Sequence, residues 1–382
     1  MVKNPPPKVI AILADLPLWT LPGLDYLGVP SGHYATWLEP LISEFEGMKD
    51  LDIHWITLSK KVVSTQRHNI FGQTVHILPR WKKSISMMTG YLGEIRRIRT
   101  IIREIRPELV HAWGSEDVYG LAGAFGPVKN RLFTLQGCLT DYLRLLGGSW
   151  LFRLQTLYEK PTIRRFSQGT AESPGAKASL HAIHPTMIIQ LVDYGVHPAF
   201  FETAWNPAPQ PEVAFLGGVT KRKGIIDLIE VAKSPDLAQI KFKIIGDGDL
   251  LPALREQSPP NVEWLGKCNR EQVIQNLATA WCLAMPTYAD TGPTVVKEAR
   301  VMGLPVVTTT GAGASCYIEH GHSGFVIEPG DLTAMRHALM QVCASRETCL
   351  VMGKHGWEEL RMQLHPRMTA ARFASIYREM TE

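Results

Sequence analysis

The chain has 382 residues, of which 45% are hydrophobic and 20% charged, and this composition excludes a disordered, collagen-like or fibrous protein. The formal net charge is +4, with 22 Lys and Arg against 16 Asp and Glu in residues 1–200 and 18 against 20 in the remainder. A first half this basic favours an anionic acceptor or membrane surface as a partner, and it falls short of the charge expected for nucleic-acid binding.

No segment of the sequence indicates a membrane span or a targeting signal. The longest apolar run, Leu277–Met285, reaches only about half of the ~18 to 20 residues that a span requires. The N-terminal segment has no small-residue cleavage site, so we expect a cytoplasmic protein, at the inner face of a membrane if it is tethered. The six cysteines lack the spacing of a zinc site or a disulfide framework, which indicates reduced thiols.

Short apolar runs alternate with helical patterns along the chain, which is typical of βαβ units around a parallel sheet. In the first half, helices are predicted at residues 33–47, 87–106, 117–126 and 148–166. Strands are predicted at Lys8–Ala14, Leu51–Leu58, Thr74–Leu78, Glu108–Trp113, Arg131–Leu135 and Met187–Val192.

The proline-rich segment Asn206–Pro211 is the best candidate linker, because proline is excluded from helix interiors and central strands. After it, strands are predicted at Val213–Leu216, Lys241–Ile245, Val262–Leu265, Trp281–Met285, Pro305–Thr308 and Phe325–Ile327. We predict an α/β protein with two doubly wound Rossmann-like domains, 1–205 and 206–365, and ligands bound at the carboxyl ends of their strands in a cleft between them.

The stretch from Ala289 to Val307 carries the most information. It predicts a strand end, a Thr-Gly-Pro turn and a helix of about ten residues, with Pro293 at the first helical position and Gly303 as the left-handed C-cap. The free amides at such a helix start form an anion site. A capped βα turn, with Asp290 as the acid at the helix start, explains the same residues without a ligand.

This stretch resembles the signature of the retaining glycosyltransferases of family 4, the "glycosyl transferases group 1", which have the GT-B fold. That signature is a Glu, seven residues, a second Glu, Ala, and a Gly-Leu-Pro-Val-Val strand. Here Asp290 replaces the first Glu with the spacing kept, and Glu298 matches the second. The resemblance implies that Glu298 contacts the nucleotide ribose and that Asp290 lies beside the donor sugar. It also implies donor binding by the turn residues Thr291, Gly292, Pro293, Thr294 and Val295.

Two further segments resemble the donor-binding half of this family. Lys223 keeps the place of a Lys that neutralises the departing diphosphate, whereas Gly218 stands where the family has an Arg. Either Lys221 or Arg222 compensates for the missing Arg, or the diphosphate is held differently. If the resemblance is set aside, the segment can be interpreted as a basic exposed turn. Gly246 and Gly248 resemble the Gly-x-Gly loop that packs against the nucleotide.

The first half resembles the family more loosely, on its acceptor side. Gly32 and His33 fall in the first βα loop, and Gln136 stands where many members have a His. His111, near the end of a predicted strand, is a conceivable base, although a core histidine is the simpler interpretation. Glu172 either faces the acceptor or is an acid at a helix start.

Two basic stretches, Arg96–Arg103 and Trp150–Arg165, also carry apolar residues at helical spacing. A basic amphipathic helix can lie on an anionic bilayer. The alternative is a helix whose apolar stripe faces the core and whose basic face is solvated.

The resemblance implies a metal-independent glycosyltransferase with no cofactor, which moves a sugar with retention from a nucleoside diphosphate sugar, UDP- or GDP-linked in preference, to a hydroxyl of a glycan or lipid-linked acceptor. It places the chain in polysaccharide or envelope glycan synthesis, and it sends the C-terminal helix, residues 366–382, back onto the first domain. In the family the leaving phosphate helps to deprotonate the acceptor. A GT-B nucleotide-sugar epimerase and a non-catalytic sugar-nucleotide or glycan-binding protein remain as alternatives.

Overall fold

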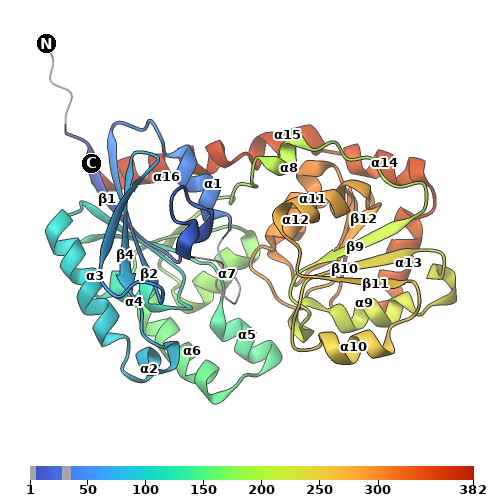
Figure 1. The fold of residues 1–382 in the computed structure, drawn as a ribbon, viewed down its shortest axis with the longest axis horizontal. Helices are drawn as coiled ribbons and strands as arrows, with labels where there is room; N and C mark the ends of the chain where they lie inside the picture. Colours follow the sequence, from blue (N-terminus) through green and yellow to red (C-terminus); the bar gives the residue numbers. More distant parts are fainter. Residues whose placement is uncertain (1–5, 28–35) are drawn as a thin grey trace, which may run out of the picture. The chain divides into compact units, whose positions relative to one another are not determined.

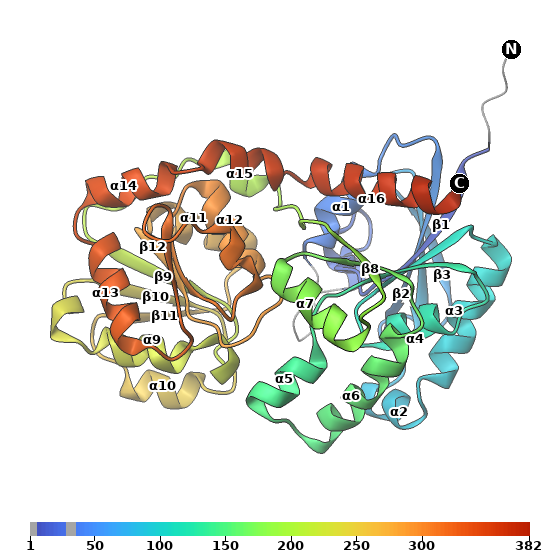
Figure 2. The ribbon, with the colours of Figure 1, turned by 180° about the vertical axis from the view of Figure 1, so that it is seen from behind.

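The fold was determined as a computed structural model, which describes residues 6–27 and 36–382. The chain forms two compact α/β units (Figures 1 and 2). The N-terminal unit comprises Met1–Gly195 and Pro366–Glu382, and the C-terminal unit is Val196–His365. The prediction of two Rossmann-like domains in an α/β fold is therefore confirmed.

The N-terminal unit is built on an eight-stranded sheet with the order β3-β4-β2-β1-β5-β6-β7-β8. All neighbouring strands are parallel except β3 and β4, which form an antiparallel pair at the edge. The polar strand β3 and the four-residue strand β7 were not predicted, because neither has an apolar run long enough to stand out. The strands are β1 (Lys8–Leu13), β2 (Leu51–Ser59), β3 (Gln66–Ile70), β4 (Gln73–Pro79), β5 (Leu109–Trp113), β6 (Asn130–Thr134), β7 (Gln168–Ala171) and β8 (Ile188–Leu191).

Helices cover both faces of this sheet. On one face, α1 and α16 pack on β1 and β5, around a core that includes Ile10, Trp55 and Phe373. On the other face, the apolar stripe of α3 packs with α4 against Ala11, Ile56 and Val110. The helices are α1 (Leu38–Glu44), α2 (Lys83–Met88), α3 (Leu92–Ile105), α4 (Val118–Ala124), α5 (Leu139–Leu146), α6 (Trp150–Ile163), α7 (Pro174–Ile183) and α16 (Pro366–Thr381).

The C-terminal helix α16 belongs to the N-terminal unit, as predicted. Its residues Ala370, Phe373, Ala374 and Tyr377 are buried in that unit's core, and Arg378 forms an ion pair with Asp50 at 2.6 Å. In Figure 2 the red helix α16 runs beside α1 and β1, elements from the opposite end of the chain. The long C-terminal segment thus closes one face of the first sheet.

The C-terminal unit is built on a six-stranded parallel sheet with the order β11-β10-β9-β12-β13-β14. Each strand matches a predicted one to within a residue. They are β9 (Glu212–Leu216), β10 (Lys241–Ile245), β11 (Val262–Gly266), β12 (Cys282–Met285), β13 (Val306–Thr309) and β14 (Gly324–Ile327). The helices are α8 (Ala199–Glu202), α9 (Ile225–Ala232), α10 (Leu251–Gln257), α11 (Arg270–Thr279), α12 (Thr294–Met302), α13 (Leu332–Val342), α14 (Arg346–Lys354) and α15 (Trp357–Gln363).

The predicted domain boundary at residue 206 is ten residues too late. The proline-rich segment is part of the C-terminal unit, because the Asn206 and Ala208 amides donate to the carbonyls of Ala278 and Thr279 at 2.9 Å. Upstream of it, Val196 and Phe200 are already buried in the core of the same unit. Proline marked a segment outside helices and strands, but such a segment need not lie where the chain passes between units.

Candidate active site

The order in which the chain adds strands to the C-terminal sheet reverses between the central strands β9 and β12. Chain order runs outward from β9 through β10 to β11 on one side, and from β12 through β13 to β14 on the other. Ligands of open α/β sheets bind outside the carboxyl ends of the strands at such a switch point. The loops that leave β9 and β12 there carry Lys223 and Asp290, two of the predicted site residues.

The side chains of these two loops meet in an ion-pair cluster. Lys223 Nζ donates to Asp290 Oδ2 at 2.5 Å, and Arg222 Nη1 donates to the same oxygen at 3.1 Å. Lys223 is buried and Asp290 nearly so, whereas Arg222 is half-buried. Burial on its own would raise the pKa of the Asp290 carboxyl, but the two cations hold that pKa well below its ordinary value. The cluster therefore holds two fixed positive charges at the carboxyl ends of the central strands β9 and β12.

The backbone of both loops is fixed. Arg222 lies in the short helix η3 (Lys221–Lys223), and its carbonyl accepts hydrogen bonds from the Tyr288 amide at 2.9 Å and from Thr287 Oγ1 at 3.0 Å. The Asp290 amide donates to the Gly311 carbonyl at 3.0 Å, and its carbonyl accepts from the Gly313 amide at 2.7 Å. Loops after three strands, β9, β12 and β13, thus hold the carboxylate and the cations in place.

Helix α12 begins at Thr294, four residues after Asp290. Pro293 was predicted to be the first helical residue, but it occupies the N-cap with an extended backbone, one position before the first helical residue Thr294, and no side chain caps the helix. The Gly292 amide donates to Asp290 Oδ1 at 3.3 Å. Gly303 ends the helix in the left-handed conformation (φ 97°), as predicted. The uncapped amides of Thr294 and Val295 and the helix dipole make this end of α12 suitable for an anion.

Glu298 lies on the second turn of α12 and is half-buried. Burial raises the pKa of its carboxyl to about 7, against the attraction of Arg270 and Lys297. A carboxyl that titrates near neutral pH on the helix that follows the ion-pair cluster is a candidate for hydrogen bonding to polyhydroxyl ligands. The structure therefore brings Lys223, Asp290 and α12 together, and it adds Arg270 to the surroundings of Glu298.

The predicted glycines serve the close approach of two loops. A Cβ on Gly246 (φ +141°) would lie 1.9 Å from the Gly217 carbonyl oxygen, and one on Gly248 would lie 2.4 Å from that of Val219. Both glycines thus let the loop after β10 lie against the loop after β9. Gly218 differs, because a Cβ there would meet no atom nearer than 3.7 Å. Of the two candidates to compensate for the Arg that the family has there, Arg222 reaches the cluster, whereas Lys221 is exposed.

In the N-terminal unit, predicted acceptor-side residues lie at the carboxyl ends of β6 and β7. Gln136 follows β6 and Glu172 follows β7, next to Ser173, which caps α7 through a hydrogen bond from the Ala176 amide. Burial, and then the charges of Glu172 and Glu116, raise the pKa of Tyr194 well above its ordinary value. Glu116 and Gln136 approach each other over Gly114, where a Cβ would lie 2.2 Å from Glu116 Oε2 and 2.8 Å from Gln136 Oε1. Gly32 and His33 lie outside the described residues.

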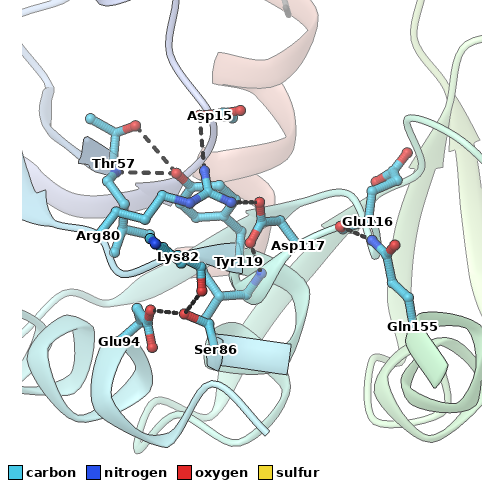
Figure 3. Close-up of polar contacts among 12 residues, drawn as sticks. Asp15, Thr57, Arg80, Lys82, Ser86, Glu94, Glu116, Asp117, Tyr119 and Gln155 are labelled. Carbon is cyan, nitrogen blue, oxygen red and sulfur yellow. Dashed lines mark hydrogen bonds and ion pairs between the residues drawn. The ribbon is translucent and has the colours of Figure 1, made fainter. Parts of the chain in front are cut away.

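A second polar cluster lies at the same edge, beyond the ends of β1, β2 and β4 (Figure 3). Arg80 forms ion pairs with Asp117 and, at 4.0 Å, with Asp15. Tyr119 Oη accepts from the Leu58 amide at 3.1 Å, and burial raises the pKa of Tyr119 well above its ordinary value. The role of Arg80 could not be predicted from the sequence, because its partner Asp117 lies 37 residues away in the chain.

His111, a predicted acceptor-side residue, lies in the core of the N-terminal unit. It is completely buried, with Nε2 2.6 Å from Thr134 Oγ1 and Nδ1 2.8 Å from Tyr377 Oη. Trp113 Nε1 donates to Nδ1 at 3.2 Å, so Nδ1 is the acceptor and Nε2 carries the proton. Burial lowers the pKa of His111 well below its ordinary value. The core interpretation of this residue is therefore the right one.

Glu159, on α6, is a buried acid near the predicted acceptor-side residues that the sequence did not single out. It is fully buried, and its carboxylate accepts from the amides of Leu139 and Thr140 at 2.8 and 2.7 Å and from Ser115 Oγ at 2.9 Å. It thereby occupies the N-terminus of α5, directly after Gln136 and Gly137, and positions that loop. No sequence signal pairs an acid with a helix start that lies twenty residues upstream.

Among residues 6–27 and 36–382, no cluster of His, Cys, Asp or Glu has the composition of a metal site. Within the same ranges, every helix is too short or too polar to span a bilayer.

Comparison with known proteins finds a family model that matches part of the chain. Residues 200–358 match the family model "Glycosyl transferases group 1", and they include the whole ion-pair cluster and α12. The chain is 26% identical over 245 residues to the amylovoran biosynthesis glycosyltransferase AmsK of Erwinia amylovora. That alignment covers 59% of this chain and 60% of AmsK, less than two thirds of the relative.

Two solved structures are similar over almost the whole chain. Sucrose-phosphate synthase from Thermosynechococcus elongatus superposes with a TM-score of 0.79 at 16% identity, covering 98% of this chain and 99% of that one. Anabaena Alr3699/HepE, solved in complex with UDP-glucose, superposes with a TM-score of 0.72 at 15% identity, covering 97% and 99%. The fold is therefore GT-B, and the resemblance to the group 1 glycosyltransferases is confirmed.

Proposed function

We propose that the chain is a glycosyltransferase that moves a sugar, with retention, from a nucleoside diphosphate sugar to a hydroxyl of a glycan or lipid-linked acceptor. Its place would be in polysaccharide or envelope glycan synthesis, which the similarity to AmsK supports. A UDP-linked donor is favoured over GDP, because HepE was solved with UDP-glucose. The observation that carries the proposal is the convergence of Lys223 and Arg222 on Asp290 at the start of α12.

The chemistry follows from these charges. Cleavage of a sugar–diphosphate bond develops negative charge on the departing diphosphate, and preorganised cations and amides stabilise that charge. Lys223, Arg222 and the amides of Thr294 and Val295 provide them. The loops after β12 and β13 hold these groups in place before the donor binds, so little reorganisation accompanies the reaction.

Asp290 keeps its charge in this arrangement, because its pKa lies far below neutral pH. An ionised carboxylate accepts hydrogen bonds from sugar hydroxyls and favours positive charge on the anomeric carbon. We assign it to the donor sugar rather than to proton transfer. Glu298, whose pKa is raised, is assigned to the ribose hydroxyls.

Calorimetric titration with UDP, GDP and ADP tests the donor assignment. We expect micromolar binding of one diphosphate, weakened at least tenfold (about 1.4 kcal/mol) by Glu298→Ala. Glu256→Ala, an exposed acid on α10, is the matched control and should leave affinity unchanged. If none of the three nucleotides binds the wild-type chain, the donor assignment is wrong.

Product analysis tests the activity itself. Incubation with the matching nucleotide sugar and a glycan or lipid-linked acceptor should release the nucleoside diphosphate and give a glycoside with the donor's anomeric configuration. Conversion of the donor to its epimer without acceptor would instead identify an epimerase. Tight nucleotide binding without turnover on any acceptor would favour the non-catalytic alternative.

A further inference from the structure

The two basic amphipathic stretches predicted from sequence differ in what they expose. In α3 the apolar stripe is buried, with Ile98, Ile101 and Ile102 in contact with the sheet. After Leu92 at the start of the helix, its exposed residues are polar or charged. That helix is an ordinary core-facing helix. In α6, and in α2 with its flanking residues, large apolar side chains are instead exposed to solvent.

Helix α6 presents a mixed apolar and basic stripe to solvent. Trp150 and Leu157, seven residues apart, are 65% and 69% exposed. Arg153, Lys160 and Arg164 fall on the same side of the helix and are exposed too. The opposite side is buried and carries Gln155, Glu159 and Ile163. An exposed tryptophan at one end of such a stripe is costly in water and favourable in a membrane interface.

Helix α2 and its flanks extend this surface. Ile85 and Met88 of α2 and Leu92 at the start of α3 are exposed, and Trp81 is exposed with its ring under the Arg97 guanidinium at 5.1 Å. The two helices are neighbours, since Tyr158 Oη of α6 donates to the Met87 carbonyl at 3.1 Å. Figures 1 and 2 both show α2 and α6 side by side at the same end of the N-terminal unit.

The charges of this surface have one sign. Residues 81–93 contain no acid, and residues 148–165 contain only Glu159, which is buried beneath α5. The next acid, Glu94, is buried as well and accepts from Ser86 Oγ (Figure 3). Every carboxylate of these segments therefore points inward, while Lys82, Arg96, Arg153 and Lys160 are exposed. Apolar side chains within a purely cationic rim complement an anionic lipid surface.

We propose that this surface, formed by α2, its flanking residues and the outer stripe of α6, docks the N-terminal unit on an anionic lipid bilayer. Trp150, Leu157, Ile85 and Met88 would enter the headgroup region, and the basic residues would contact lipid phosphates. The proposal is independent of the donor chemistry, because bilayer binding is measured without turnover; its failure leaves the proposed function intact.

Sedimentation of the full chain with vesicles tests the proposal. One set of vesicles contains equal parts of phosphatidylcholine and phosphatidylglycerol, and the other contains phosphatidylcholine alone. We expect binding to the first set, weakened by added salt, and much weaker binding to the second. Arg153→Glu with Lys160→Glu, and separately Trp150→Ser with Leu157→Ser, should each weaken binding to anionic vesicles about tenfold or more.

The matched control is Val351→Ser with Met362→Ser, which removes two side chains, 65% and 67% exposed, from the C-terminal unit. It should bind vesicles as the wild type does. All of these variants change exposed residues, so unchanged thermal unfolding is expected and is measured in parallel. The proposal is overturned if the wild type ignores anionic vesicles, or if the control pair weakens binding as much as the α6 pairs. It is also overturned if the Trp150 pair abolishes self-association of the chain without changing vesicle binding, which would identify a protein interface.

Discussion

Lys223 Nζ lies 2.5 Å from Asp290 Oδ2, and this contact joins loops that leave two adjacent strands of the C-terminal sheet, β9 and β12. Arg222 shares the same oxygen. In the absence of a ligand, Asp290 already pairs with both cations. A diphosphate that binds here therefore competes with the carboxylate for Lys223 and Arg222. This competition leads to opposite expectations for the two partners.

Lys223→Ala should weaken diphosphate binding and lower kcat/KM by about 100- to 1000-fold, because it removes a buried cation from the developing charge. Lys221→Ala, an exposed neighbour on the same turn, should change either quantity less than threefold. Calorimetry and steady-state kinetics on both variants provide the comparison. Full activity of Lys223→Ala would remove this residue from the mechanism.

Asp290→Asn should abolish turnover and yet bind the free diphosphate at least as tightly as the wild type. The substitution removes the anion that competes for Lys223 and Arg222, while it also removes the carboxylate assigned to the sugar. The split between affinity and turnover distinguishes this role from misfolding, which would lower both. Weaker binding of the diphosphate by Asp290→Asn would contradict the competition.

The raised pKa of Glu298 predicts a pH-dependent stability. A carboxyl whose pKa is raised to about 7 by folding takes up a proton on folding, so its contribution is fully present below the unfolded pKa of about 4.3 and is lost as pH rises toward 7. The free energy of unfolding in urea of the wild type, less that of Glu298→Gln, should therefore fall between pH 5 and 7, as the pH approaches the raised pKa of about 7. Above that pKa the difference should level off. A difference that stays constant with pH would show that Glu298 is ionised throughout.

His111 is expected to matter for stability and not for catalysis. His111→Ala removes three buried hydrogen bonds and leaves a cavity beneath α16, which should cost about 2 to 4 kcal/mol. Activity per folded molecule, measured well below the transition, should be unchanged. His181→Ala, on the exposed side of α7, is the control and should affect neither. Loss of kcat in a folded His111→Ala would revive the catalytic interpretation.

The parts of the site that sequence could predict are those with local signals. Lys223, Asp290 and Glu298 lie in motifs whose spacing follows one turn or one helix, and the order of strands brings the first two together. That Arg222 rather than Lys221 joins them depends on the rotation of η3, which spacing does not determine. Glu159 and Arg80 depend on contacts between elements 20 and 37 residues apart, respectively, and no local pattern encodes such pairs.

The domain boundary illustrates the same limit. Asn206–Pro211 has the composition of a linker, but its hydrogen bonds to the end of α11 show that it belongs to the C-terminal unit. The C-terminal helix could be assigned to the first unit only through the family resemblance. Its burial against β1 and β5 is a long-range contact.

Gly218 offers a test of how much of the family's diphosphate site this chain has replaced. A side chain at this position meets open space, since its Cβ would lie 3.7 Å from the nearest atom, and its backbone has no positive φ. Gly218→Arg should therefore fold with stability within about 0.5 kcal/mol of the wild type. Gly246→Ala is the contrasting variant, because its Cβ would lie 1.9 Å from the Gly217 carbonyl oxygen. Its free energy of unfolding should fall several times more than that of Gly218→Arg. If Arg222 already supplies the second cation, Gly218→Arg alone should tighten diphosphate binding less than tenfold. Arg222→Ala alone should lose affinity for the diphosphate. The double variant, Gly218→Arg with Arg222→Ala, should recover most of that lost affinity. Failure of that rescue, with the double variant folded, would mean that Arg222 acts by orienting Asp290 rather than by binding phosphate.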